Sequence, residues 1–161
     1  MKKYQKINYK DLSPKQQENY NFHKVSSILA DYGFTTIKLY DDWKNADFIA
    51  QHKDRKTFLK VQLKNRLLID KKYEGKDIYI CFLLRNNLYL YPHDKAVEYI
   101  LANSNVGNTK SWNKKDGQYH WPKIPKRFFT FLDEYKLSKW NEKTIYKSVT
   151  AKKINDKRVY N

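Results

Sequence analysis

The run Asp47-Phe48-Ile49-Ala50 is followed by seven polar residues and then by Phe58-Leu59-Lys60-Val61-Gln62-Leu63-Lys64. Both runs read as short β-strands joined by a tight hairpin. Successive side chains of a strand point to opposite faces, so Lys60, Gln62 and Lys64 share one face and the apolar residues between them share the other. A carboxylate, an amide and an amine can therefore converge beside this hairpin. Groups of these kinds suit a divalent metal, a phosphate and an attacking water.

An α-helix is predicted before the hairpin. Ser13 can cap its amino end, Pro14 suits the first helical position, and Gln16 can reach back to the capping residue. The helix runs to about residue 32, where Gly33 ends it. Helical spacing places five residues in one narrow stripe that we expect to be buried: Glu18, Phe22, Val25, Leu29 and Tyr32. Glu18 either lies in a solvated first turn, where the helix dipole favours an acid, or points into the same cleft as Asp47.

The remaining strands and a second helix are indicated by composition. Residues 34–40 are rich in β-branched and aromatic side chains, and Asp41-Asp42 is expected to turn the chain. The apolar run 78–84 is typical of a doubly buried strand, and residues 88–91 form its partner. A helix from about His93 to Leu101 follows. Residues 67–75 form a connector whose secondary structure the sequence does not indicate. The order of the other elements predicts an α/β fold with a mixed central sheet flanked by helices.

Length and charge limit the possible functions. The chain has 161 residues, 40% of them hydrophobic, which is enough for one substantial core. Lys and Arg number 33 against 17 Asp and Glu, giving a formal net charge of +16, so a polyanion such as DNA or RNA is the expected partner. No run has the length of a membrane span, and polar residues follow Met1-Lys2-Lys3, so we expect a cytoplasmic protein without a membrane partner. Cys81 is expected to be a buried hydrophobe rather than a nucleophile.

The order of these elements and residues resembles the core of the PD-(D/E)XK nuclease superfamily over roughly residues 14–102. Asp47 matches the motif aspartate, Gln62-Leu63-Lys64 matches the acid-x-Lys element, and Glu18 is similar to the helix glutamate of many members. Ala46 stands where the motif proline often sits, and Gln62 replaces the usual acid. Such a Gln-x-Lys variant is similar to that of small intron-encoded homing endonucleases. The resemblance implies a restriction-endonuclease-like αβββαβ core.

The chemistry of the site can also be argued from the residues. Mg²⁺ binds hard oxygens, typically one or two carboxylates with water and phosphate, so Asp47 and the Gln62 carbonyl fit as ligands. Glu18 would restore the charge that the glutamine lacks. Lys64 would lie beside the scissile phosphate and orient or deprotonate the attacking water. We therefore predict Glu18, Asp47, Gln62 and Lys64 as catalytic residues, the first three as ligands of Mg²⁺, with Mn²⁺ able to substitute. A surface ion pair between Asp47 and Lys64 is the simpler alternative.

We expect a nuclease core over residues 1–105 and a basic, aromatic DNA-binding extension over residues 106–161, packed on or extending from the same domain. The extension mixes aromatic, amide and basic groups around Gly117, a composition suited to phosphate contact and base stacking. Its aromatic residues can equally be anchors of a small satellite core. Residues 136–161 are expected to be a mobile arm or a helix that orders on DNA. The predicted DNA contacts are Lys60, Lys110, Trp112, Lys114, Lys115, Trp121, Lys123, Lys126 and Arg127.

These observations favour a metal-dependent endonuclease acting on duplex DNA, of the homing or restriction type. A homodimer or higher symmetric oligomer is expected, because paired subunits match the two strands. A Holliday-junction resolvase is the next choice. Two further classes stay open: a catalytically inactive nucleic-acid-binding protein of the same fold, and an interaction module whose basic face binds an acidic protein.

Overall fold

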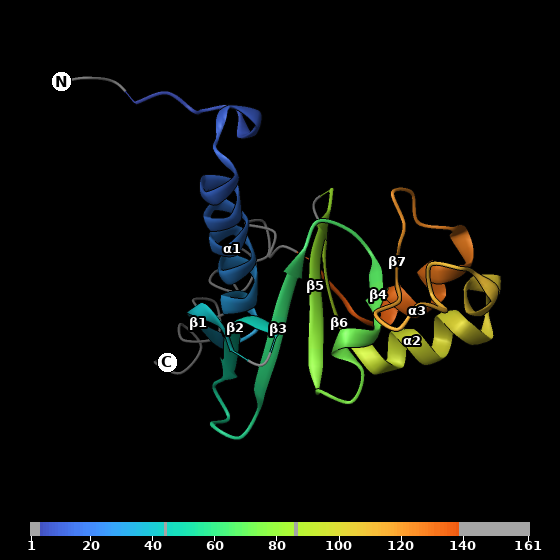
Figure 1. The fold of residues 1–161 in the computed structure, drawn as a ribbon. Helices are drawn as coiled ribbons and strands as arrows, with labels where there is room; N and C mark the ends of the chain where they lie inside the picture. The colour runs from blue at the N-terminus through green and yellow to red at the C-terminus, as the bar shows by residue number, and fades with distance from the viewer. Residues whose placement is uncertain (1–3, 44, 86, 139–161) are drawn as a thin grey trace, which may run out of the picture.

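The computed structural model describes residues 4–43, 45–85 and 87–138, and within these the chain forms eight strands and three α-helices (Figure 1). The strands are β1 (Phe34–Trp43), β2 (Ala46–His52), β3 (Phe58–Lys64), β4 (Leu68–Asp70), β5 (Ile78–Leu84), β6 (Asn87–Pro92), β7 (Gln118–His120) and β8 (Lys136–Ser138). The α-helices are α1 (Pro14–Asp31), α2 (His93–Ala102) and α3 (Phe129–Glu134). Short 3₁₀ turns cover Tyr9–Asp11, Lys71–Tyr73, Asn105–Asn108 and Lys126–Phe128.

The centre of the fold is a mixed sheet with the strand order β1-β2-β3-β5-β6-β8. Only β3 and β5 pair in parallel in this sheet, and its other neighbouring strands pair antiparallel. α1 lies on one side of the sheet, and α2, α3 and the small β4-β7 sheet lie on the other (Figure 1). The predicted α/β class, a mixed central sheet flanked by helices, is therefore confirmed.

The element order differs in detail from an αβββαβ core. The segment between β3 and β5 contains β4 and a 3₁₀ turn, whereas α2 comes only after β6. Asp41 and Asp42 continue β1 instead of turning the chain, and the backbone reverses at Asn45, whose φ is +65°. Asparagine tolerates this left-handed conformation better than most residues. β1 therefore continues through Asp41 and Asp42 as far as Trp43, which pairs with Ala46 at the start of β2.

α1 begins as its sequence predicts. The Ser13 N–H donates to Gln16 Oε1 over 2.9 Å, and Ser13 Oγ accepts from the Gln16 N–H at 3.4 Å, which completes a capping box. Past the other end of α1, Gly33 has a φ of +79°, a conformation that glycine adopts without strain. Val25 and Leu29 are buried as expected. Tyr32 is 40% exposed, so the prediction was wrong there: this residue is the C-cap of α1, where the helical periodicity behind the prediction ends.

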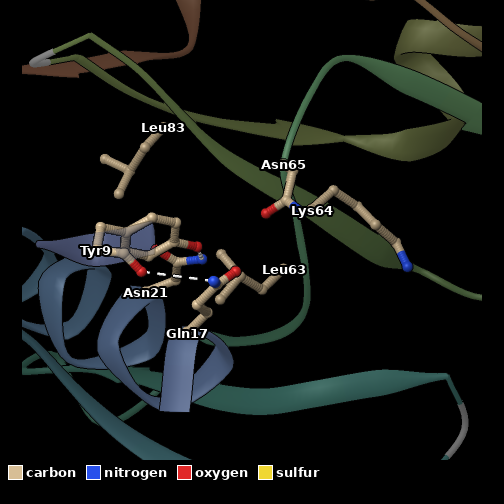
Figure 2. Close-up of a pocket in the computed structure, with 7 residues that line it drawn as sticks. All are labelled: Tyr9, Gln17, Asn21, Leu63, Lys64, Asn65 and Leu83. Carbon is tan, nitrogen blue, oxygen red and sulfur yellow. Dashed lines mark hydrogen bonds between the residues drawn. The ribbon is translucent and has the colours of Figure 1, made fainter. Parts of the chain in front are cut away.

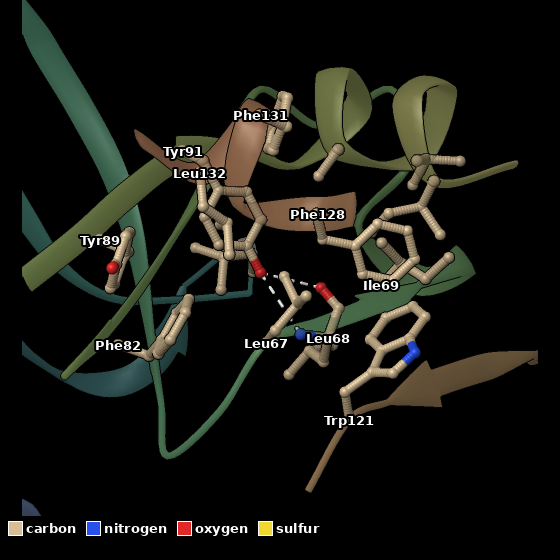
Figure 3. Packing of buried hydrophobic residues seen from close by; sticks show 14 of the residues in the cluster. Leu67, Leu68, Ile69, Phe82, Tyr89, Tyr91, Trp121, Phe128, Phe131 and Leu132 are labelled. Atoms are coloured by element: carbon tan, nitrogen blue, oxygen red, sulfur yellow. Dashed lines mark hydrogen bonds between the residues drawn. The ribbon is translucent and has the colours of Figure 1, made fainter. Parts of the chain in front are cut away.

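Two core clusters lie on opposite faces of the sheet. The α1 cluster includes Phe48, Val61 and Cys81, so the predicted alternation in β3 and the burial of the thiol are confirmed. The second cluster joins β5 and β6 to residues 106–132, and Figure 3 shows its aromatic and aliphatic side chains packed together. Tyr91 crosses this cluster and donates its hydroxyl hydrogen to Leu68 O over 2.9 Å. The described part of the carboxyl-terminal extension thus shares its core with the sheet. Residues 139–161, which hold most of the predicted basic arm, lie outside the described residues.

A buried histidine ties the β4 segment to α2. His93 is fully buried, and its Nε2 accepts a hydrogen bond from the Asp70 N–H at 3.0 Å. Nδ1 therefore carries the proton and donates to Asp94 Oδ1 over 3.1 Å. Asp94 in turn accepts the Gly75 N–H through Oδ2. Burial lowers the pKa of His93, and Asp94 offsets part of this effect.

Acid is expected to unfold the protein through His93. Below the ordinary pKa of 6.5 the His93 side chain takes up a proton in the unfolded chain, whereas in the folded chain it stays neutral to lower pH. The stability that neutral His93 contributes is therefore fully present above that pH and is lost as the pH falls. The variant His93→Gln should be less stable by about 1–2 kcal/mol near pH 7, with a flatter pH dependence. Urea unfolding between about pH 5 and 8 measures both effects. His23→Gln, at an exposed site on α1, is the control, and an equally steep pH dependence in His93→Gln would contradict the assignment.

Candidate functional site: a carboxylate cleft at the ends of two strands

The site forms where β2 and β3 separate. Their ladder runs from the pair Gln51–Phe58 to the pair Phe48–Val61, and the same register places Asp47 opposite Gln62. Asp47 Oδ2 accepts the Gln62 Nε2–H at 2.6 Å and the Leu63 N–H at 2.7 Å. The carboxylate thus accepts a backbone hydrogen bond where the ladder has ended. Among the described residues no hydrogen bond reaches the other oxygen, Oδ1, which remains available to a ligand.

The four residues predicted as catalytic line one cavity of about 260 Å³: Glu18, Asp47, Gln62 and Lys64. An adjoining cavity of about 360 Å³ shares Glu18, Asp47 and Lys64 with it. A third, of about 400 Å³, continues past Lys64 to Tyr9. We call these three cavities the carboxylate cleft. The helix acid, the strand aspartate and the two alternate side chains of β3 therefore meet in space.

The far end of the cleft is neutral and polar. Figure 2 shows Tyr9 next to Gln17 and Asn21 of α1, with the Lys64 side chain extending away from them. The Asn21 Nδ2–H donates to the Tyr9 hydroxyl over 2.8 Å, and the Gln17 Nε2–H donates to Leu12 O over 2.9 Å. These bonds connect the 3₁₀ turn before α1, and the residue that follows it, to the helix at this end of the cleft.

Asp47 is held in a place that disfavours its charge. Burial raises the pKa of the Asp47 carboxyl, and the Leu63 N–H, Lys64 and Gln62 offset only part of this rise. The negative charge of Glu18 raises it further. A half-buried carboxylate whose charge is incompletely compensated is stabilised by a proton or by a cation. This is the electrostatic condition expected of a cation ligand.

Glu18 lies at the rim of the cleft. Its carboxylate pairs with Lys15 at 2.9 Å and with Lys38 at 3.0 Å, and its side chain is 48% exposed. The hydrogen bond from Lys15, and then that from Lys38, lower the pKa of Glu18, so it is charged at neutral pH. Both interpretations of this residue describe part of its setting: it is solvated in the first turn and it lines the same cavity as Asp47.

Lys64 is half-buried beside an aromatic ring. Its Nζ lies 5.7 Å from the centroid of the Tyr73 ring, and Lys72 Nζ lies 4.8 Å from the same ring. Tyr73 is buried, so it is a fixed wall against which the lysine is held. Lys72 and Asp41 also line the cavity, and neither was predicted. Extending the strand pattern past residue 40 would have found Asp41, whereas no sequence signal placed the connector that carries Lys72.

Lys60 shares a face with Gln62 but does not reach the cleft. Its Nζ donates to Lys76 O and lies 3.7 Å from Asp77 Oδ2. The Lys60 side chain therefore links β3 to the loop before β5. Its predicted role as a DNA contact is untested, and in this structure its amine already has two protein partners.

The aromatic candidates of the extension are core residues. Trp112 and Trp121 are 5% and 8% exposed and belong to the cluster that packs on β5 and β6, so the base-stacking prediction is corrected and the packing alternative holds. The basic candidates of the extension are exposed: Lys110, Lys114, Lys115, Lys123, Lys126 and Arg127. They occupy two surfaces, because Lys114 lines a cavity of about 600 Å³ whereas Lys123 and Lys126 line another of about 590 Å³.

A cation in this cleft would have few charged ligands. Within residues 4–43, 45–85 and 87–138, no three His, Cys, Asp or Glu side chains are close enough to hold a metal ion together. Asp47 Oδ1 and the Gln62 amide oxygen remain, with Glu18 at the rim. Mg²⁺ commonly takes one or two carboxylates and completes its shell with water and phosphate, so this donor set fits Mg²⁺ better than a metal that needs a closed protein cage.

No helix in the described part of the chain is long and apolar enough to span a bilayer.

Comparisons with known proteins assign no family to this chain. No family model matches the sequence, and no curated protein matches it. Among solved structures, a bacterial homing endonuclease, I-Ssp6803I, is similar at 15% sequence identity with a TM-score of 0.44. The match covers 76% of this chain and 94% of that one. At this level of similarity, function has to be inferred from the geometry of the carboxylate cleft.

Proposed function

We propose that this chain is a metal-dependent endonuclease that hydrolyses phosphodiester bonds in duplex DNA. The observation that carries the proposal is the meeting of Asp47, Gln62 and Lys64 in one cavity, with Glu18 at its rim. The formal charge of +16 supports a polyanionic substrate. Because one active site cuts one strand, a homodimer or higher symmetric oligomer would cut both.

Asp47 and Gln62 would hold the cation, with Glu18 near enough to add charge. The two hydrogen bonds to Asp47 Oδ2 orient the carboxylate and leave Oδ1 for the ion. The Gln62 amide donates through Nε2, so its oxygen is directed elsewhere and can act as a ligand. Mg²⁺, when bound, would supply positive charge beside the phosphate as negative charge develops there. Mn²⁺ prefers the same oxygen ligands and should substitute.

Lys64 would act on the phosphate and the attacking water. Its amine is half-buried against Tyr73, and its charge acts on the Asp47 carboxylate, so it lies beside any phosphate that enters the cavity. In this position it can orient the water and offset charge on the five-coordinate phosphorus. Lys72, on the same ring, is placed to contact an adjacent phosphate oxygen.

A catalytically inactive nucleic-acid-binding protein is the second candidate. The lack of a cluster of three ligand-type side chains among the described residues favours it. The Asp47–Gln62 hydrogen bond would then be a structural pair that replaces a lost metal site.

Substitutions of Gln62 distinguish the metal-dependent endonuclease from the inactive nucleic-acid-binding protein. Supercoiled plasmid is incubated with the protein across a titration of Mg²⁺ or Mn²⁺, and nicking and linearisation are followed on gels. Gln62→Ala should lower the cleavage rate by about 10-fold or more, and Gln62→Glu should lower the Mg²⁺ concentration needed for half-maximal rate, because it adds a charged ligand. Gln51→Glu, on β2 outside the cleft, is the matched control.

Two outcomes would overturn parts of this proposal. Full activity in Gln62→Ala would remove the amide from the site. Absence of cleavage by the wild type at every metal concentration, with DNA binding that survives EDTA, would establish the inactive binding protein.

A further inference from the structure

A second cavity, of about 590 Å³, lies between the β5–β6 hairpin and residues 121–136. Five basic side chains and one acid line it: Arg66, Arg85, Lys123, Lys126, Lys136 and Asp133. We call it the basic cavity. Its ionic groups carry a net charge of +4, the difference between five positive charges and one negative.

These positive charges have no anionic partner inside the described part of the protein. Around the carboxylate cleft, by contrast, Lys15, Lys38 and Lys72 each pair with a carboxylate. In residues 4–43, 45–85 and 87–138 no ion pair involves the five basic residues of the basic cavity, and all five are exposed. Unpaired cations gathered at one concave site repel each other, so they favour an anion from outside the chain.

The floor of the basic cavity is apolar. It includes the buried side chains of Phe82, Tyr89 and Trp121, which Figure 3 shows among the packed side chains of the core. The Phe82 and Tyr89 rings are stacked, with centroids 5.1 Å apart. A wall of low polarity beneath charges of one sign concentrates their field and strengthens anion binding relative to a flat surface.

The basic cavity adjoins the carboxylate cleft. Asn65 lines the basic cavity and also two of the three cleft cavities, both of which are lined by Lys64 as well. The three consecutive residues Lys64, Asn65 and Arg66 therefore pass from one site to the other. The cavity at Lys114 differs in both respects: its single lysine is balanced by Asp116, and it shares no lining residue with the cleft.

We propose that the basic cavity binds the phosphate backbone of the nucleic-acid strand on one side of the scissile phosphate. This deepens the proposed endonuclease function and rests on it for the position of the cut. The chain's own residues 139–161 are a poor occupant, because they contain seven Lys and Arg against two acids and share the sign of the cavity. A strand anchored here would pass Asn65 to reach Lys64.

The test measures binding in the absence of divalent metal. A fluorescein-labelled duplex of about 20 base pairs is titrated with the full chain in EDTA at several salt concentrations, and anisotropy gives the affinity. Removing two phosphate contacts with Arg66→Ala/Lys123→Ala should weaken binding about 5–10-fold near 0.15 M salt and make the slope of log K against log salt less negative by about 2. Both side chains are exposed, so the fold should hold, and thermal unfolding checks this.

The matched control removes the same charge from exposed positions outside both sites. Lys56→Ala/Lys95→Ala, whose side chains are exposed and line neither the basic cavity nor the carboxylate cleft, should weaken binding less than 2-fold, with a slope change below about 0.5. An unchanged slope in Arg66→Ala/Lys123→Ala, or an equal loss in the control, would overturn the proposal. Because no metal is present, either result is independent of whether the protein cleaves DNA, so failure of the nuclease function would be seen separately in the plasmid assay.

Discussion

The Asp47→Asn variant is expected to lose DNA cleavage by about 10³-fold or more while keeping its fold. Asparagine can accept the hydrogen bonds of Gln62 and Leu63 through one oxygen, so the hairpin geometry is retained. It lacks the charge that would hold the cation. Single-turnover cleavage of plasmid in Mg²⁺ measures the loss, and binding of the labelled duplex in EDTA should remain within about 2-fold of the wild type.

The same variant is expected to be more stable than the wild type at about pH 8. Because burial raises the pKa of Asp47, its charged form costs stability in the folded chain, and protonation removes this cost as the pH falls. The advantage of Asp47→Asn should therefore shrink towards acid pH. Thermal unfolding between about pH 4 and 8 measures the trend. A variant that gains stability while losing activity identifies a residue placed for function.

Asp54 provides the opposite control. Its carboxylate is exposed and accepts hydrogen bonds from the backbone and hydroxyl of Thr57 and from the Lys56 N–H, which lower its pKa. Its charged form stabilises the turn above the ordinary pKa, so Asp54→Asn should lower stability at neutral pH and leave cleavage unchanged. Asp47→Asn would contradict our assignment if it cleaved like the wild type, or if it were less stable at every pH.

The elements that the sequence predicted well are those set by local chemistry. Ser13 and Gln16 cap α1 because both lie within four residues of each other, and the alternation around Gln62 needs only the period of a strand. Asp47 and Gln62 meet because a short turn fixes the hairpin register. The convergence of the site was therefore predictable from one hairpin and the helix before it.

The features that the sequence did not predict depend on tertiary packing. Trp112 and Trp121 lie in a loop-rich segment whose composition suits either DNA contact or burial, and only the core of β5 and β6 decides between them. Tyr73, which positions Lys64, comes from a connector with no periodic pattern. Glu18 pairs with Lys15 of α1 and with Lys38 of β1. The pair with Lys38 could not be predicted without knowing how α1 packs on β1.

The Lys64→Met variant is expected to reduce cleavage by about 10³-fold with little loss of duplex binding. Methionine matches the lysine side chain as far as Cε, so the change removes mainly the Nζ amine, with its charge and its proton donor, from beside Tyr73. Rates are measured at saturating Mg²⁺ with plasmid in single turnover, and binding is measured in EDTA. Loss of binding in proportion to the rate would indicate a phosphate contact without a part in the chemical step.

Lys60→Met on the same strand face is the matched control, because the Lys60 amine is held by Lys76 O and Asp77 away from the cleft. It should cleave within about 3-fold of the wild type.

The pH profile of the cleavage rate gives a second measurement of the role of Lys64. The Lys64 charge lowers the pKa of Asp47, so its removal should raise that pKa further and shift the residual activity of Lys64→Met to higher pH. Lys60→Met should leave the profile in place. If both variants lost activity equally, or neither profile moved, Lys64 would act only as part of the general positive charge of the surface, and the cleft would lose the group that we propose works on the phosphate.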